Sequence, residues 1–116
     1  MKSRRLNGQN SQENLSKKLQ QVQGELDEVS KNIEEMSFMG ISGGGAAEVV
    51  LKGSKLAESI KISEEAKKDL EKDKDSLENI LDLIVAAFND ALQKIDSYTD
   101  NEISNITKGL NIPGLK

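Results

Sequence analysis

The spacing of apolar residues along the chain predicts two long helices separated by a short β-rich segment. In the first third of the chain, apolar residues recur at alternating intervals of four and three, which is the spacing of a heptad seam. This pattern predicts a helix over residues 11–36, with Ser11 as a candidate N-cap. The first ten residues lack the periodicity, and we expect them to be frayed. The seam consists of Leu15, Leu19, Val22, Leu26, Val29, Ile33 and Met36.

The segment 40–62 is the place where apolar residues leave helical spacing and tend toward a period of two, which predicts strands over residues 46–52 and 55–62. Its glycine triplet, residues 43–45, frees the backbone from Cβ sterics where helix gives way to strand. Gly53 and Ser54 supply the reversal between the strands. We interpret the segment as a hairpin that serves either as a hinge between the helices or as the surface through which two chains share a sheet.

The remainder of the chain predicts a short helix and then a long one. Ser63 followed by two glutamates is typical of a helix cap and first turn, and this helix should end near Leu70. The alternating charges of residues 71–75 predict an exposed linker. From Ser76 an amphipathic helix is expected to run to Gly109, a candidate C′ residue. Its apolar stripe comprises Leu77, Ile80, Leu81, Ile84, Phe88, Ala91, Leu92 and Ile95.

This order of elements predicts an α+β fold with a long N-terminal helix, a β-hairpin layer, a short helix and a long C-terminal helix. We expect one domain over residues 11–109, preceded by a flexible basic segment, 1–10, and followed by a tail, 110–116. Both long helices exceed the length of the hairpin, so we expect an antiparallel helical pair rooted on it. The start of the first helix would then meet the end of the last at the far tip.

The composition favours a homodimer. Only 35% of the 116 residues are hydrophobic, with two Phe, one Tyr and no Trp, which is a thin core for one chain. Long amphipathic helices around a single hairpin would leave apolar surface in water, and a second copy would cover it. The basic N-terminus has no apolar run after it, and no window approaches the length of a membrane span. These features predict a cytoplasmic protein without a membrane partner.

The chemistry available to the chain argues against an enzyme. It has neither Cys nor His, which excludes zinc sites built on thiolate or imidazole and the usual nucleophilic triads. The acid-rich stretch from Asp69 fails as a calcium loop, because Lys74 and Ile80 occupy the positions of the required glycine and bidentate acid. Asp82 and Asp90 are interpreted as solvated acids without partners. We expect no catalysis, no cofactor, no metal and no small-molecule substrate.

Charge is distributed unevenly along the first helix. The chain carries a net charge of −4, but residues 1–20 carry +4 and residues 21–50 carry −5. Lys17 and Lys18, with the glutamines that follow them, are suited to phosphate contacts and amide hydrogen bonds. The alternative is a solvated polar face. The lysines of the predicted strands leave the same two interpretations open.

Five segments of the chain together resemble the YbaB/EbfC family of bacterial nucleoid-associated proteins, over about residues 12–115. The most specific are the run D-L-I-V-A-A-F-N-D-A-L, at 82–92, and the ending G-L-N-I-P-G-L, at 109–115. The others are S-G-G-G at 42–45, V-V-L-K-G at 49–53 and S-I-K-I-S at 59–63.

The resemblance implies a tweezer-like homodimer with a shared β-core, projecting helices that bind double-stranded DNA, no catalysis, and location in the cytoplasm at the nucleoid. The candidate DNA contacts are Lys17 and Lys18 on the matched helix, with Arg4, Arg5 and Lys2 upstream of the well-matched region. The family's first helix is often rich in Met, Gln and Lys, whereas this one becomes acidic from Glu25 onward. The alternative function is a scaffold that keeps the fold and binds a protein partner through its amphipathic helices.

Overall fold

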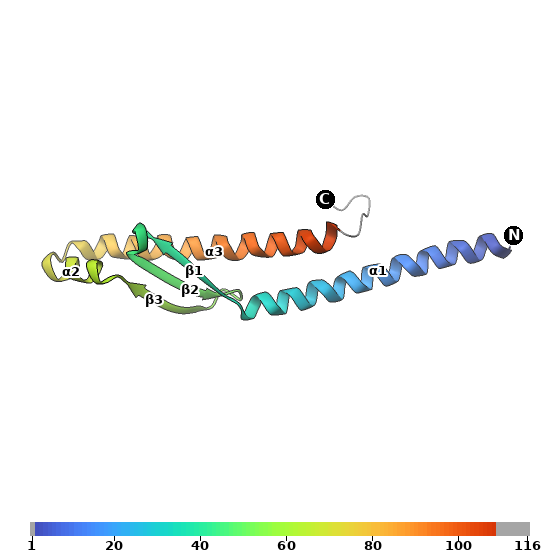
Figure 1. Ribbon diagram of the computed structural model, residues 1–116, viewed down its shortest axis with the longest axis horizontal. Coiled ribbons are helices and arrows are strands. Elements are labelled where there is room, and N and C mark those ends of the chain that lie inside the picture. Colours follow the sequence, from blue (N-terminus) through green and yellow to red (C-terminus); the bar gives the residue numbers. More distant parts are fainter. Residues whose placement is uncertain (1, 109–116) are drawn as a thin grey trace.

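The computed structural model describes the backbone of residues 2–108 and the side chains of residues 13–108. It confirms an α+β fold with long N- and C-terminal helices, shown in Figure 1. In chain order the elements are α1 (Lys2–Glu35), β1 (Ser37–Ser42), the 3₁₀ turn η1 (Gly43–Gly45), β2 (Ala47–Lys52), β3 (Ala57–Ile62), α2 (Glu64–Lys72) and α3 (Ser76–Lys108).

The β-layer has three antiparallel strands in the order β1-β2-β3, so the prediction of a two-stranded hairpin missed one strand. The hairpin itself is present as β2 and β3, with Val49 opposite Ile60. The additional strand, β1, pairs with β2 and places Gly40 opposite Val49. Its alternation is hidden in the sequence because Gly40 and Ser42 occupy two of the three inward positions, while Met39 and Ile41 point to the exposed face.

Helix α3 packs on β1 and β2 and forms the core with them. Ala47, Val49 and Leu51 of β2 are fully buried, and Ala87, Ala91 and Ile95 of α3 lie against them. The approach is close because Gly40 has no side chain: a Cβ built there would lie 1.9 Å from the carbonyl oxygen of Ala87. Small residues on both elements therefore bring the backbone of α3 onto β1.

Helix α1 makes the molecule elongated. It has 34 residues, which corresponds to a length of about 51 Å. The radius of gyration is 23.2 Å, whereas a compact chain of this length would have about 13 Å. Figure 1 shows α1 leaving the sheet and extending past the end of α3, so the expected meeting of the two tips is wrong.

The boundaries of the helices differ in part from the predicted ones. Helix α1 begins at Lys2, so Ser11 lies inside it and is not its cap. The cap of α2 is confirmed, since the Oγ of Ser63 accepts a hydrogen bond from the N–H of Ala66 at 3.1 Å. Helix α2 continues to Lys72, which shortens the predicted linker. Gly109 and the tail, 110–116, lie outside the described residues, and the division at residues 10 and 110 stays a prediction.

No helix within residues 2–108 combines the length and the apolar character that crossing a membrane requires.

Candidate nucleic-acid interface

The N-terminal part of α1, residues 2–24, projects from the rest of the fold and is called the arm below (Figure 1). The heptad seam of α1 is buried only where the helix nears the sheet. Ile33 is 5% exposed, whereas Leu15 and Leu19 on the arm are 48% and 47% exposed. The expectation that a second copy covers the apolar surface of the long helices stays a prediction for this half of the seam.

The arm presents Lys17 and Lys18 to solvent, and both side chains are exposed. Lys17 is 200° around the helix from Leu15 and from Leu19, so it points away from the apolar seam. Among the side chains of residues 13–108, none forms an ion pair with either lysine. Their charge is therefore available to an anion.

The five predicted contact positions all lie on α1. Lys2, Arg4 and Arg5 fall in its first turns, where the structure describes the backbone and not the side chains. Lys17 and Lys18 follow after about four turns of the same helix. Apart from Glu13, the acids of α1 begin at Glu25, on the side of the arm nearer to the sheet. Position along the helix thus separates the cations from most of the acids.

Asp90 on α3 holds the edge of β1, which corrects the prediction that it lacks partners. The N–H of Ile41 donates a hydrogen bond to Oδ2 of Asp90 at 2.9 Å. Nζ of Lys94 lies 3.2 Å from the same oxygen and donates to the carbonyl oxygen of Met39 at 2.8 Å. The hydrogen bond from Ile41, followed by that from Lys94, lowers the pKa of Asp90 below its ordinary value. This aspartate therefore ties the longest helix of the core to the sheet.

The spacing of Asp90 and Lys94 at i and i+4 is visible in the sequence as a helical ion pair. Their hydrogen bonds to β1 cannot be recognised in the sequence, because Met39 and Ile41 are about fifty positions earlier in the chain. Asp82, in contrast, is exposed, as the prediction for it states.

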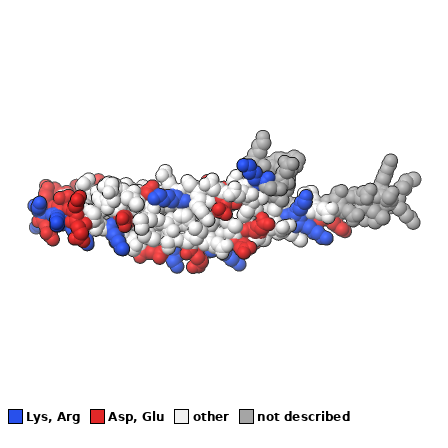
Figure 2. Space-filling view, viewed as in Figure 1, with Lys and Arg blue, Asp and Glu red and all other residues white. Residues whose placement is uncertain are grey.

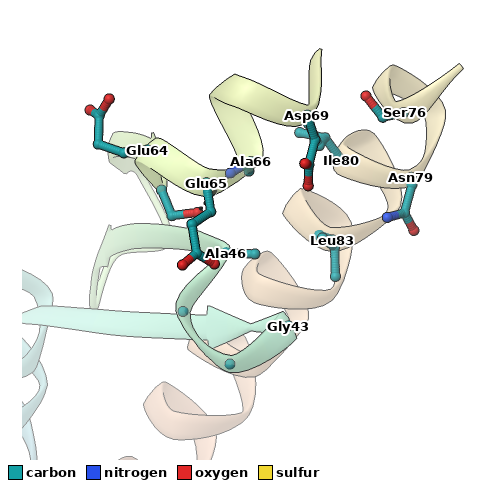
Figure 3. A pocket seen from close by; sticks show the side chains of 13 residues that line it. Gly43, Ala46, Glu64, Glu65, Ala66, Asp69, Ser76, Asn79, Ile80 and Leu83 are labelled. Carbon is teal, nitrogen blue, oxygen red and sulfur yellow. Dashed lines mark hydrogen bonds between the residues drawn. The ribbon is translucent and has the colours of Figure 1, made fainter. Parts of the chain in front are cut away.

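The opposite end of the molecule is unsuited to phosphate. A depression of about 510 Å³ lies between η1, α2 and α3, and Glu64, Glu65 and Asp69 are among its lining residues (Figure 3). Figure 2 shows acids and lysines intermingled at this end, where residues 64–78 contain seven acids and four lysines. In the part of the chain that the structure describes, no group of three or more potential ligands is placed to hold a metal ion.

The lysines of the hairpin are not gathered into a patch. Lys55 lies in the turn between β2 and β3, at a φ of 73°, and its Nζ is 3.9 Å from Oδ1 of Asp96 on α3. Lys61 is exposed on β3, next to Ile60 and Ile62. The arm, which carries five cations and one acid, Glu13, therefore remains the surface on which basic residues predominate.

Comparison with known proteins agrees with this architecture. The model of the YbaB/EbfC DNA-binding family matches residues 8–110. A nucleoid-associated protein of Clostridium acetobutylicum is 38% identical over 108 residues, covering 93% of this chain and 92% of the relative. A second, of Acetivibrio thermocellus, is 41% identical over 103 residues, covering 88% of this chain and 87% of the relative.

A solved structure has the same fold. The crystal structure of an uncharacterized protein from Helicobacter pylori superposes with a TM-score of 0.59 at 19% identity, covering 80% of this chain and 92% of that one. The family match spans the arm from residue 8 onward, the whole sheet and α3. The chain belongs to the YbaB/EbfC DNA-binding family.

Proposed function

We propose that this protein is a nucleoid-associated protein of the cytoplasm that binds double-stranded DNA mainly through electrostatic contacts of its arm. The family match and the names of the relatives support a role at the nucleoid. The observation that carries the choice of surface is the exposure of Lys17 and Lys18 on a helix that projects from the fold.

The charge of the whole molecule makes the location of these cations decisive. A net charge of −4 repels DNA on average. Salt screens charge interactions beyond about 8–10 Å at ordinary concentrations. The acids at the far end of the molecule therefore have little effect on the attraction between a cation on the arm and a phosphate. Each phosphate that a lysine neutralises releases condensed counterions from the duplex, which favours binding.

Within the arm, we assign phosphate contacts to Lys17 and Lys18, and further contacts to Arg4, Arg5 and Lys2 nearer the N-terminus. Phosphate contacts carry no sequence information, so this mode of binding predicts weak sequence preference. No catalytic step, cofactor or metal is part of the proposed function.

The proposed binding unit is a homodimer. The exposed apolar residues Leu15, Leu19, Leu81, Val85 and Ile60 are each between 47% and 58% exposed in one chain. Surfaces of this kind mark interaction sites when they are contiguous. Two copies joined through their sheets would present two arms, double the number of lysines and grip one duplex from two points.

The test is a titration of random and genomic duplexes by fluorescence anisotropy at a series of salt concentrations. The variant Lys17→Glu/Lys18→Glu should bind all sequences more weakly and show a shallower salt dependence. If the dimer contributes four neutralised phosphates, the slope of log K against log salt should fall by about 3.6 when these contacts are lost. The matched control, Lys68→Glu/Lys72→Glu on exposed positions of α2, makes the same change of charge at the far end.

Equal loss of affinity in both variants would show that net charge, and not the arm, governs binding. Absence of any binding at about 50 mM salt, together with isolation of a stable protein partner, would instead support the scaffold function.

A further inference from the structure

The apolar seam of α1 continues beyond the part that the rest of the fold covers. Ile33 is buried and Val22 is half-buried, whereas every residue from 13 to 21 is exposed. Leu15 and Leu19 keep the seam spacing all the same, one helical turn apart and on one face. These two leucines, 48% and 47% exposed, form what is called the apolar strip below. An amphipathic helix presents such a strip to a segment that packs on it.

Helix α3 ends beside the part of α1 where this cover is lost. The two helices are in contact, and Figure 1 shows α3 stopping part of the way along α1, after which α1 continues alone. The last residue of α3 is Lys108. Gly109 and the tail, 110–116, follow it in the sequence and lie outside the described residues. The tail is therefore attached close to the point where the apolar strip begins.

The sequence of the tail is suited to an extended segment with one apolar side. Leu110 and Ile112 alternate with Asn111, and alternate residues of an extended chain point to the same side. Pro113 disfavours helical backbone at the residue before it, Ile112, and favours extended backbone there. The sequence thus predicts two apolar side chains on one side of an extended stretch, with the amide of Asn111 on the other.

The tail matches the apolar strip in spacing and in reach. Two residues of extended chain advance about 6.6 Å, and four residues of helix advance about 6 Å. Leu110 and Ile112 are therefore about as far apart as Leu15 and Leu19. The seven residues of the tail span about 23 Å when extended, whereas Leu15 lies about 14 Å along the helix from Gly24, where the arm begins. The tail is long enough to pass both leucines.

We propose that the tail packs in extended form on the apolar strip of its own chain, with Leu110 beside Leu19 and Ile112 beside Leu15. Chain direction sets this order, because α3 runs away from the sheet toward Lys108 (Figure 1). The proposal goes beyond DNA binding and concerns what supports the projecting arm.

The docked tail is compatible with the proposed function. Lys17 is 200° around the helix from both leucines, so a segment on the apolar strip leaves it free for phosphate. A second copy of the chain then has the exposed apolar residues of α3 and β3 to cover, among them Leu81, Val85 and Ile60.

Paired cysteines test the position of the tail, because the chain contains none of its own. Leu19→Cys/Leu110→Cys should form a disulfide within one chain on mild oxidation, since side chains in contact can reach the geometry of the bond. The matched control is Gln21→Cys/Leu110→Cys, because Gln21 is also exposed but lies 200° around the helix from Leu19. The first disulfide should form at least about tenfold faster, which corresponds to a preference of about 1.4 kcal/mol for the apolar face.

Denaturing gels without reductant and mass spectrometry of tryptic peptides identify the bonds formed. Equal rates in the two variants would overturn the proposal, because a tail without a fixed place reaches both faces of the helix. A disulfide that joins two chains would overturn the assignment to the same chain and show that the tail of a second copy covers the apolar strip.

The second measurement is amide hydrogen exchange in residues 15–22 of the arm. Ile112→Ser should speed this exchange about fivefold, the equivalent of 1 kcal/mol of lost burial. In a Leu15→Ala background, which removes the contact from the other side, Ile112→Ser should have no further effect. Asn111→Ser is the matched control and should leave the exchange unchanged.

Unchanged exchange in Ile112→Ser, or an equal acceleration with and without Leu15, would contradict docking on the apolar strip. Neither measurement uses DNA. A protein whose tail docks but which fails to bind duplexes would refute the proposed function alone, and one that binds duplexes without a docked tail would refute this inference alone.

Discussion

Substitution of Gly40 by alanine should be the most damaging small change in the sheet. The added Cβ would lie 1.9 Å from the carbonyl oxygen of Ala87 and 2.5 Å from the backbone nitrogen of Ala91. Carbon and oxygen atoms ordinarily approach no closer than about 3.3 Å, so α3 would have to retreat by about 1.4 Å. Neither neighbour is a flexible side chain that can rotate away, because both are backbone atoms of a helix.

The retreat of α3 has a cost that can be approximated from its contacts. Overpacking of this kind costs about 1–3 kcal/mol. The bond from the N–H of Ile41 to Asp90, now 2.9 Å, would also pass beyond hydrogen-bonding distance, which adds to the loss. The overpacking alone is a large fraction of a total stability that for small proteins is about 5–15 kcal/mol.

Thermal unfolding by circular dichroism at fixed protein concentration measures this loss, and the midpoint should fall by about 4 °C or more. Gly24→Ala is the matched control, since nothing lies within 4 Å of a Cβ at that position in α1. At that position alanine should stabilise the helix by about 1 kcal/mol relative to glycine, because of its higher helix propensity. A Gly40→Ala protein that melts within about 2 °C of wild type would refute the close seating of α3 on β1.

Two further substitutions test a helix cap and an ion pair. Ser63→Ala removes the acceptor for the N–H of Ala66 and should lower the free energy of unfolding by about 1 kcal/mol in urea titrations; an unchanged midpoint would show that the cap is dispensable. Asp90→Asn tests pH dependence, because the pKa of Asp90 is lower in the folded protein than its ordinary 3.8. Such a group stabilises the fold above its unfolded pKa, and this stabilisation is lost as the pH falls through the folded pKa. Asp90→Asn should therefore flatten the acid limb of stability below about pH 4, and an acid limb as steep as in wild type would contradict this role.

Much of the architecture follows from apolar periodicity, and the misses have physical causes. Helix α3 is predictable because its stripe repeats over many turns, and β2 is predictable because it alternates. Strand β1 is missed because two of its three inward positions are the small residues Gly40 and Ser42, and the close approach of α3 requires the glycine at position 40. The start of α1 is missed because helix propagates from a formed nucleus without needing an apolar stripe of its own.

The residues of the candidate site likewise differ in whether the sequence predicts their role. Exposure of Lys17 and Lys18 is predictable from their position off the seam. The role of Asp90 is not, because its partner Ile41 is distant in sequence and only the fold brings them together. The run at 82–92 contains the alanines that allow the approach and the aspartate that holds β1, so its most distinctive residues serve the junction of helix and sheet.

In the proposed function, the segment 40–62 contributes to DNA binding indirectly, because it positions the arm. It contains the end of β1, the glycine turn, β2 and β3, and it contributes three of the six buried residues of the core cluster. Because α1 enters β1 directly and Gly53 donates its N–H to the carbonyl of Met36 at 2.8 Å, the direction of the arm is set at its junction with this sheet. A rigid junction fixes the angle between two arms in a dimer, and a loosened one allows them to spread. Substitutions at Gly40 or Gly53 should consequently alter DNA binding through the separation of the arms even where Lys17 and Lys18 are untouched.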